Sequence, residues 1–151
     1  MNIVATQYNL EHRALEIYVS GCTLHCKNCH NPELQNFDTG TPYETWIDKL
    51  DRKMIDFADI IDNIWILGGE PLDQDVWNLK DLLYNMSLHG KKIWIFTGYN
   101  YNRAAERGSI NMWALVNYLK YGAYKDDDLT DDNIQFGVKL ASGNQGIKEL
   151  K

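Results

Sequence analysis

Three short apolar runs alternate with longer segments of helical periodicity over the first two thirds of the chain. The runs cover residues 12–21, 63–67 and 92–96, and a glycine ends the first of them. Alternating or near-continuous apolarity over so few residues is typical of strands, and strands covered on both faces belong to parallel sheets. The pattern therefore predicts three buried strands.

Two helices are expected between these strands. Residues 41–44, Thr-Pro-Tyr-Glu, have the order of a capping box with proline in the first helical position, which predicts a helix start. Residues at helical spacing then form a buried stripe of Trp46, Leu50, Met54, Phe57 and Ile61. A second stripe consists of Val76, Leu79, Leu83 and Met86, with Gly90 as the C-terminal stop. This order of strands and helices favours βαβ units and the α/β class.

The last third of the chain has a weaker pattern. Residues 112–119 fit a helix or a strand, because periodicity does not separate the two in so short a run. The aspartates at 126–128 and 131–132 predict an exposed loop, and residues 134–140 predict a late strand. The pattern indicates no role for the segment from Lys139 to Gln145.

Length and charge exclude several classes of protein. The 151 residues suit one domain, and the net charge of −6 argues against a nucleic-acid binder that depends on phosphate contacts. No apolar run approaches the ~20 residues of a membrane-spanning helix. Residues 1–7 contain neither a basic region nor a long apolar stretch, so we expect no secretion signal and a reducing, cytoplasmic environment.

All three cysteines, Cys22, Cys26 and Cys29, lie in one loop directly after the first predicted strand. Their thiolates suit an iron–sulfur cluster or zinc. Both kinds of site are normally completed by four protein ligands, and the chain has no fourth cysteine. We therefore expect one coordination position to be left for a group other than cysteine, and we expect the chemistry of the protein at that position.

Three other interpretations of the cysteines exist. A zinc site completed by His25 or His30 has a known ligand set, Cys₃His, although the spacing is not the usual paired one. Buried free cysteines are disfavoured by their clustering in a polar loop, and a disulfide framework is disfavoured by the odd count. The zinc site and the cluster both remain open on spacing alone.

The ends of the next two predicted strands carry further candidate binding residues. Gly68-Gly69-Glu70-Pro71 follows the second strand, and Thr97-Gly98-Tyr99 follows the third. Ligands of parallel α/β sheets bind at the carboxyl ends of the strands, so both segments should line one rim with the cysteine loop. A glycine pair allows backbone to approach a ligand closely, and Glu70 or nearby carbonyl groups could hold an ammonium group.

A C-x₃-C-x₂-C loop after one strand and Gly-Gly-Glu-Pro after the next resemble the radical S-adenosylmethionine (SAM) enzymes. The resemblance implies that Cys22, Cys26 and Cys29 hold three irons of a 4Fe-4S cluster. It implies that the methionine amino and carboxylate groups of SAM bind the fourth iron. SAM and the cluster are therefore the expected cofactors.

The same resemblance extends to SAM binding and to the fold. It implies that Gly68 to Glu70 face the methionine ammonium and that the backbone at Asn28 meets adenine. Pro71 and residues 97–99 complete the expected cofactor-binding set. A closed eight-stranded barrel typically needs ~250 residues. We therefore expect a single radical SAM domain over residues 1–151, with the α/β fold of an open, partial (βα) barrel.

Within this superfamily the chain most resembles the activating components of the anaerobic (class III) ribonucleotide reductases. The supporting features are its small size, Cys29-His30-Asn31, Thr97-Gly98-Tyr99 and Ser142-Gly143-Asn144-Gln145. The resemblance implies that an external one-electron donor such as flavodoxin reduces the cluster and that SAM yields methionine and a 5′-deoxyadenosyl radical. It implies that this radical takes a hydrogen atom from a glycine of the reductase large subunit. Activation of another glycyl radical enzyme, radical chemistry on a small molecule and a zinc-stabilised binding module remain the alternatives.

Overall fold

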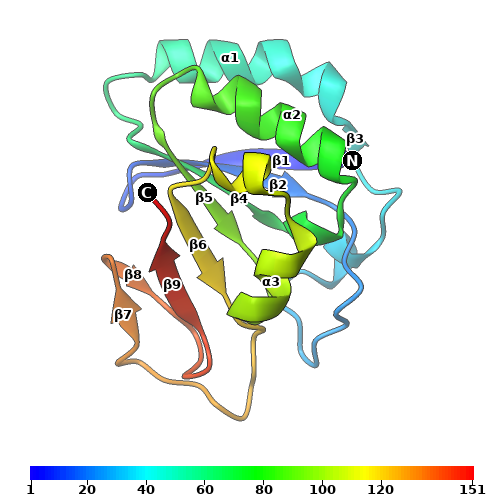
Figure 1. Cartoon of the computed structure of the whole chain (residues 1–151), viewed down its shortest axis with the longest axis vertical. Coiled ribbons are helices and arrows are strands. Elements are labelled where there is room, and N and C mark those ends of the chain that lie inside the picture. The colour runs from blue at the N-terminus through cyan, green and yellow to red at the C-terminus, as the bar shows by residue number, and fades with distance from the viewer.

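The computed structural model, which describes residues 1–151, is built around a seven-stranded sheet in the order β3-β1-β2-β4-β5-β6-β9 (Figure 1). The four central strands are parallel, namely β2 (Ala14–Val19), β4 (Asn63–Gly68), β5 (Lys92–Phe96) and β6 (Tyr118–Tyr121). The antiparallel strands that flank them are β1 (Asn2–Asn9), β3 (Thr41–Pro42) and β9 (Gly146–Glu149). The α/β class with a parallel core is confirmed.

The three predicted strands are present as β2, β4 and β5, in neighbouring positions of the sheet. Strand β1 lies outside the prediction. Only Ile3 of its eight residues is buried, so β1 lacks the apolar run that marks the inner strands. It pairs with β2 in antiparallel register and places the N-terminal segment at one side of the parallel core.

Helices cover one face of the sheet (Figure 1). They are α1 (Ile47–Asp56), α2 (Val76–Ser87), α3 (Tyr101–Arg107) and α4 (Ile110–Trp113), with 3-10 turns at Pro32–Gln35, Tyr43–Trp46 and Pro71–Asp73. The largest buried cluster lies between helices and sheet and includes Leu15, Ile17, Leu50, Met54, Ile64, Leu79 and Leu83. None of the helices combines the length and apolar character needed to cross a bilayer.

The capping box expected at residues 41–44 is wrong. Thr41 and Pro42 form β3 and pair with β1, and the Thr41 hydroxyl accepts a hydrogen bond of 2.7 Å from the Trp46 indole. Helix α1 begins only at Ile47, after a 3-10 turn. The predicted stripe is therefore shorter than expected, because the helix ends at Asp56. Pairing with a distant strand has overridden a local helix signal.

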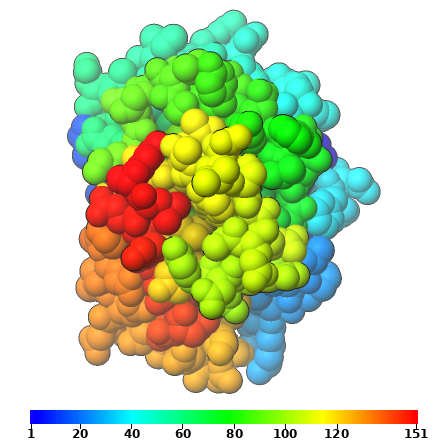
Figure 2. All heavy atoms as spheres, viewed as in Figure 1, coloured from blue at the N-terminus to red at the C-terminus, as the bar shows by residue number.

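The opposite face of the sheet carries a second cluster, rich in aromatic residues. The rings of Trp94 and Tyr118 stack with their centroids 4.1 Å apart. Val138 and Leu140, from the C-terminal part of the chain, pack against them. In the space-filling view these C-terminal segments, in orange and red, gather at one side of the molecule (Figure 2).

The single strand predicted over residues 134–140 is wrong. The segment is a hairpin of β7 (Ile134–Gln135) and β8 (Val138–Lys139). Phe136 and Gly137 form its turn with φ of 50° and 77°, the positive values that a tight hairpin turn of two residues favours. Residues 112–119, which fitted helix or strand, divide between α4 and β6.

Asp75 caps helix α2, since its carboxylate accepts hydrogen bonds from the backbone amides of Trp77 (3.1 Å) and Asn78 (3.0 Å). We expect Asp75→Ala to lower the free energy of unfolding by about 1 kcal/mol, because two amides at the helix start lose their acceptor. Chemical denaturation measures this change. Asp75→Asn keeps an acceptor and should retain most of the stability. An alanine variant as stable as the parent would exclude the capping role.

Candidate iron–sulfur site

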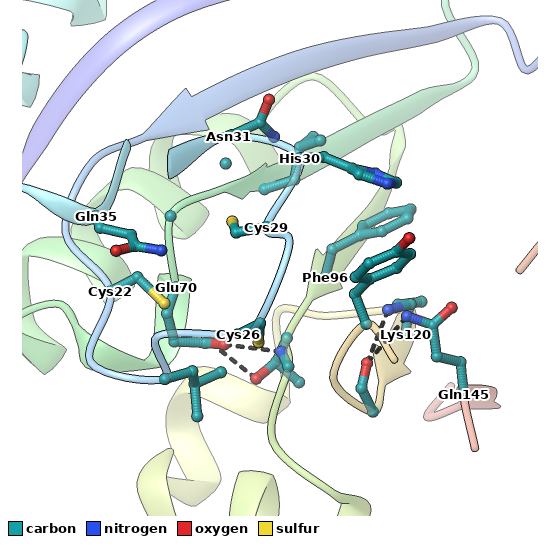
Figure 3. Close-up of a pocket in the computed structure, with 18 residues that line it drawn as sticks. Cys22, Cys26, Cys29, His30, Asn31, Gln35, Glu70, Phe96, Lys120 and Gln145 are labelled. Atoms are coloured by element: carbon teal, nitrogen blue, oxygen red, sulfur yellow. Dashed lines mark hydrogen bonds between the residues drawn. The ribbon is translucent and has the colours of Figure 1, made fainter. Parts of the chain in front are cut away.

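The cysteine loop follows β2 and lies at the carboxyl ends of the parallel strands. Cys22, Cys26 and Cys29 are free thiols, each half-buried, and all three line one cavity of about 290 Å³. Figure 3 shows their sulfur atoms around a common space. The sequence-predicted convergence of the three thiols is therefore visible in the fold, and none of them is in a disulfide.

Most of the predicted rim residues line the same cavity. Those that the structure brings together with the cysteines are Gly68, Gly69, Glu70, Thr97 and Gly98. They come from the ends of β4 and β5, which the parallel pairing places beside the end of β2. This juxtaposition follows from the topology, because parallel neighbours end at the same edge of a sheet.

Asn28, Pro71 and Tyr99 lie outside the cavity lining. The exposed Asn28 side chain donates a hydrogen bond of 2.6 Å to Asp126. Pro71 is buried at the start of a 3-10 turn, and the Tyr99 hydroxyl donates to the Asp73 carboxylate. The structure therefore gives all three residues contacts within the chain, and the cofactor-binding role expected for them stays a prediction.

Glu70 links the ends of β4 and β5. Its carboxylate is buried and accepts hydrogen bonds from the backbone amides of Leu72 (2.9 Å) and Gly98 (2.8 Å) and from the Thr97 hydroxyl (2.8 Å). Burial raises the pKa of Glu70 to about 7, although these donors favour the charged form. The carboxylate therefore already has three donors from the chain, whereas no hydrogen bond within the chain ends on the carbonyl oxygen of Gly69.

The glycine pair brings the end of β4 into close contact with the cysteine loop. A Cβ atom at Gly69 would lie 2.6 Å from the carbonyl oxygen of Gly21 and 2.8 Å from that of Leu34. The amide of Gly69 donates to the carbonyl of Val19 at 2.8 Å. The close approach that the structure shows is thus between two backbone segments of this chain. This contact positions the start of the cysteine loop at the end of the sheet.

Several lining residues were not predicted from the sequence, above all Lys120 of β6 and Gln145 before β9. The Gln145 amide nitrogen donates to the carbonyl of Gly122 at 3.2 Å. Sequence reasoning missed both residues because β6 was not recognised as the fourth parallel strand. The sequence does contain a signal for β6. Gly122 follows the run Tyr118–Tyr121 in the same way that Gly68 follows the apolar run 63–67.

The acidic segment, predicted to be an exposed loop, closes one side of the site. Asp126 is half-buried and accepts from Asn28, and it pairs with Lys27 at 3.3 Å. The ring of Tyr124 lies 4.3 Å from the ring of His30. The end of β6 and the cysteine loop are thus joined across the rim of the cavity.

The donor set fits a multi-iron cluster. Cys22, Cys26 and Cys29 line one cavity, and cysteine thiolates are the usual ligands of iron–sulfur clusters. His30 packs on an aromatic ring, and His25 Nδ1 lies 3.3 Å from Gln35. Burial raises the pKa of the Cys22 and Cys26 thiols, and bound metal would stabilise their thiolate forms.

Comparison with known proteins agrees with this donor set. The chain belongs to the family described as the 4Fe-4S single cluster domain, whose model matches residues 12–147. It is 29% identical over 143 residues to an anaerobic ribonucleoside-triphosphate reductase-activating protein from Salmonella typhi. It is 27% identical over 139 residues to the protein of the same name from Escherichia coli K12. Each alignment covers 89% of this chain and 87% of the relative, and the resemblance predicted from the sequence is confirmed.

Proposed function

We propose that this chain binds a 4Fe-4S cluster through Cys22, Cys26 and Cys29, cleaves SAM reductively and generates a glycyl radical on the large subunit of an anaerobic ribonucleotide reductase. The observation that carries the proposal is a cavity lined by three thiols in a chain with no fourth cysteine. Three ligands leave one iron free for SAM. A bound and reduced cluster would supply the electron for cleavage of the SAM carbon–sulfur bond, which would yield methionine and a 5′-deoxyadenosyl radical able to take a hydrogen atom from the glycine.

The chain's own residues bind and orient SAM in this proposal. The carbonyl of Gly69, which has no donor within the chain, offers an acceptor for the methionine ammonium. Glu70, held by Thr97 and Gly98, places a carboxyl group in the same wall. The backbone near Asn28 is the proposed adenine contact. These residues would hold the reacting atoms at near-attack distance and keep water out.

The open sheet supports a protein partner. Strands β3 and β9 are its two edges, and they do not pair with each other. We assign the fold to an open, partial (βα) barrel of the radical SAM type, whose gap admits the glycine-bearing segment of the reductase. That segment would complete the enclosure around the radical. The names of the relatives support the reductase as partner, and a cytoplasmic donor such as flavodoxin would supply the electron.

Cleavage of SAM is the direct test. We expect anaerobically reconstituted protein, reduced with dithionite, to convert SAM into methionine and 5′-deoxyadenosine, both measured by liquid chromatography. The same protein without dithionite is the control and should form neither product. A chain that takes up one zinc ion and no iron, or a reduced cluster that leaves bound SAM intact, would contradict the proposal.

A further inference from the structure

Lys120 places an ammonium group in the cavity that the three cysteines line. It lies near the end of β6, and Figure 3 shows it approaching the cavity from the side opposite Cys22. Its Nζ atom donates one hydrogen bond of 3.0 Å, to the carbonyl oxygen of Gly122, and takes part in no ion pair within the chain. A lysine ammonium has three N–H donors, so two of them are free for other partners.

The charges around Lys120 indicate which partner it serves. Burial lowers the pKa of Lys120 to about 8, and the negative charges of Glu70 and Cys26 oppose that shift. Of these two groups, Glu70 already accepts hydrogen bonds from three donors. Cys26 has no such set of donors, and its sulfur would carry negative charge once it binds a cluster.

A purely structural role explains the position of Lys120 poorly. A half-buried ammonium loses hydration, and a single hydrogen bond to a carbonyl recovers only part of that loss. An apolar side chain could fill the same position on β6 without this cost. The charge therefore needs a negative partner in the cavity, and thiolates that bind a cluster supply one.

We propose that Lys120 raises the reduction potential of the 4Fe-4S cluster held by Cys22, Cys26 and Cys29, by placing a positive charge in the cavity that these three cysteines line. Reduction moves one electron from an external one-electron donor onto a group that three thiolates already make negative. A nearby ammonium stabilises the added charge, and net charge and hydrogen bonds to sulfur are the factors that set cluster potentials. The inference rests on the cluster-binding part of the proposed function and not on SAM or the reductase.

The midpoint potential of the cluster, measured without SAM by a dithionite titration followed by electron paramagnetic resonance, tests this role. We expect Lys120→Met to shift the potential to a more negative value, while Lys120→Arg, which keeps the charge, stays near the parent. Lys148→Met is the matched control. It removes the same charge from an exposed side chain of β9, opposite Leu119 in register, and should leave the potential unchanged.

Iron and sulfide content must first show that each variant carries the cluster. If Lys120→Met does not load, Lys120→Gln gives the same comparison with a neutral polar side chain. A fully loaded neutral variant with the parent potential would overturn the inference. So would an unchanged potential with weaker SAM binding, which would assign Lys120 to the SAM carboxylate. A parent protein that binds no cluster would instead refute the proposed function.

Discussion

Replacing Cys22, Cys26 or Cys29 by alanine, one at a time, should abolish binding of the 4Fe-4S cluster. Each cysteine would be the only protein ligand of one iron, and the chain has no fourth cysteine to substitute for it. Anaerobic reconstitution followed by iron and sulfide analysis and absorption spectroscopy measures the loss. The parent should carry one cluster per chain, and each variant should carry none.

Histidine variants provide the control for these cysteine changes. His30 lines the cavity, and His25 belongs to the same loop, so a zinc site of the Cys₃His type would take one of them as its fourth ligand. His25→Ala and His30→Ala should keep the cluster. A cysteine variant that retains the full cluster would show that the ligand is misassigned, and zinc uptake that depends on a histidine would favour the zinc-stabilised module.

Gly69→Ala should disrupt the cysteine loop and reduce cluster uptake. The new Cβ would meet backbone carbonyl oxygens of Gly21 and Leu34 at 2.6 and 2.8 Å, and backbone on both sides cannot move away cheaply. Overpacking of this kind costs about 1–3 kcal/mol of unfolding free energy. Denaturation of the cluster-free protein measures the stability, and reconstitution measures the uptake.

Gly98→Ala is the matched comparison in the same cavity. Its Cβ would come within 2.4 Å of Leu24 Cδ1, the end of a flexible side chain that can change rotamer, and it meets no backbone atom closer than 3.7 Å. We expect Gly98→Ala to cost less stability and to keep the cluster. Equal effects of the two alanines would argue against the close packing of Gly69 as the cause.

The part of the site that the sequence predicted depends on short-range signals. The cysteine spacing and the glycines after β4 and β5 can be read locally, and parallel pairing then brings them to one edge of the sheet. The side of the site formed by β6 depends on contacts between distant segments. The Asn28–Asp126 hydrogen bond joins residues 98 positions apart, and the spacing of apolar residues along the chain does not predict such a contact.

The errors in the predicted fold also arise from contacts between distant segments and from short elements. The segment at residues 41–44 has the residues of a helix cap, yet Thr41 pairs with Ile3 and becomes part of β3. Helix α4 and strand β6 are each only four residues long, and such short elements give too few positions for a period to emerge. Lys120 was overlooked for this reason, since its position at a strand end appears only once β6 is placed.

The glycyl radical is the most direct measure of the proposed function. Reduced, reconstituted protein mixed anaerobically with SAM and the cognate anaerobic ribonucleotide reductase should produce a doublet in the electron paramagnetic resonance spectrum, split by the remaining α-hydrogen. The doublet should disappear when the radical glycine of the reductase is replaced by alanine. Turnover of SAM without a protein radical, together with a chemically modified small molecule, would contradict the account.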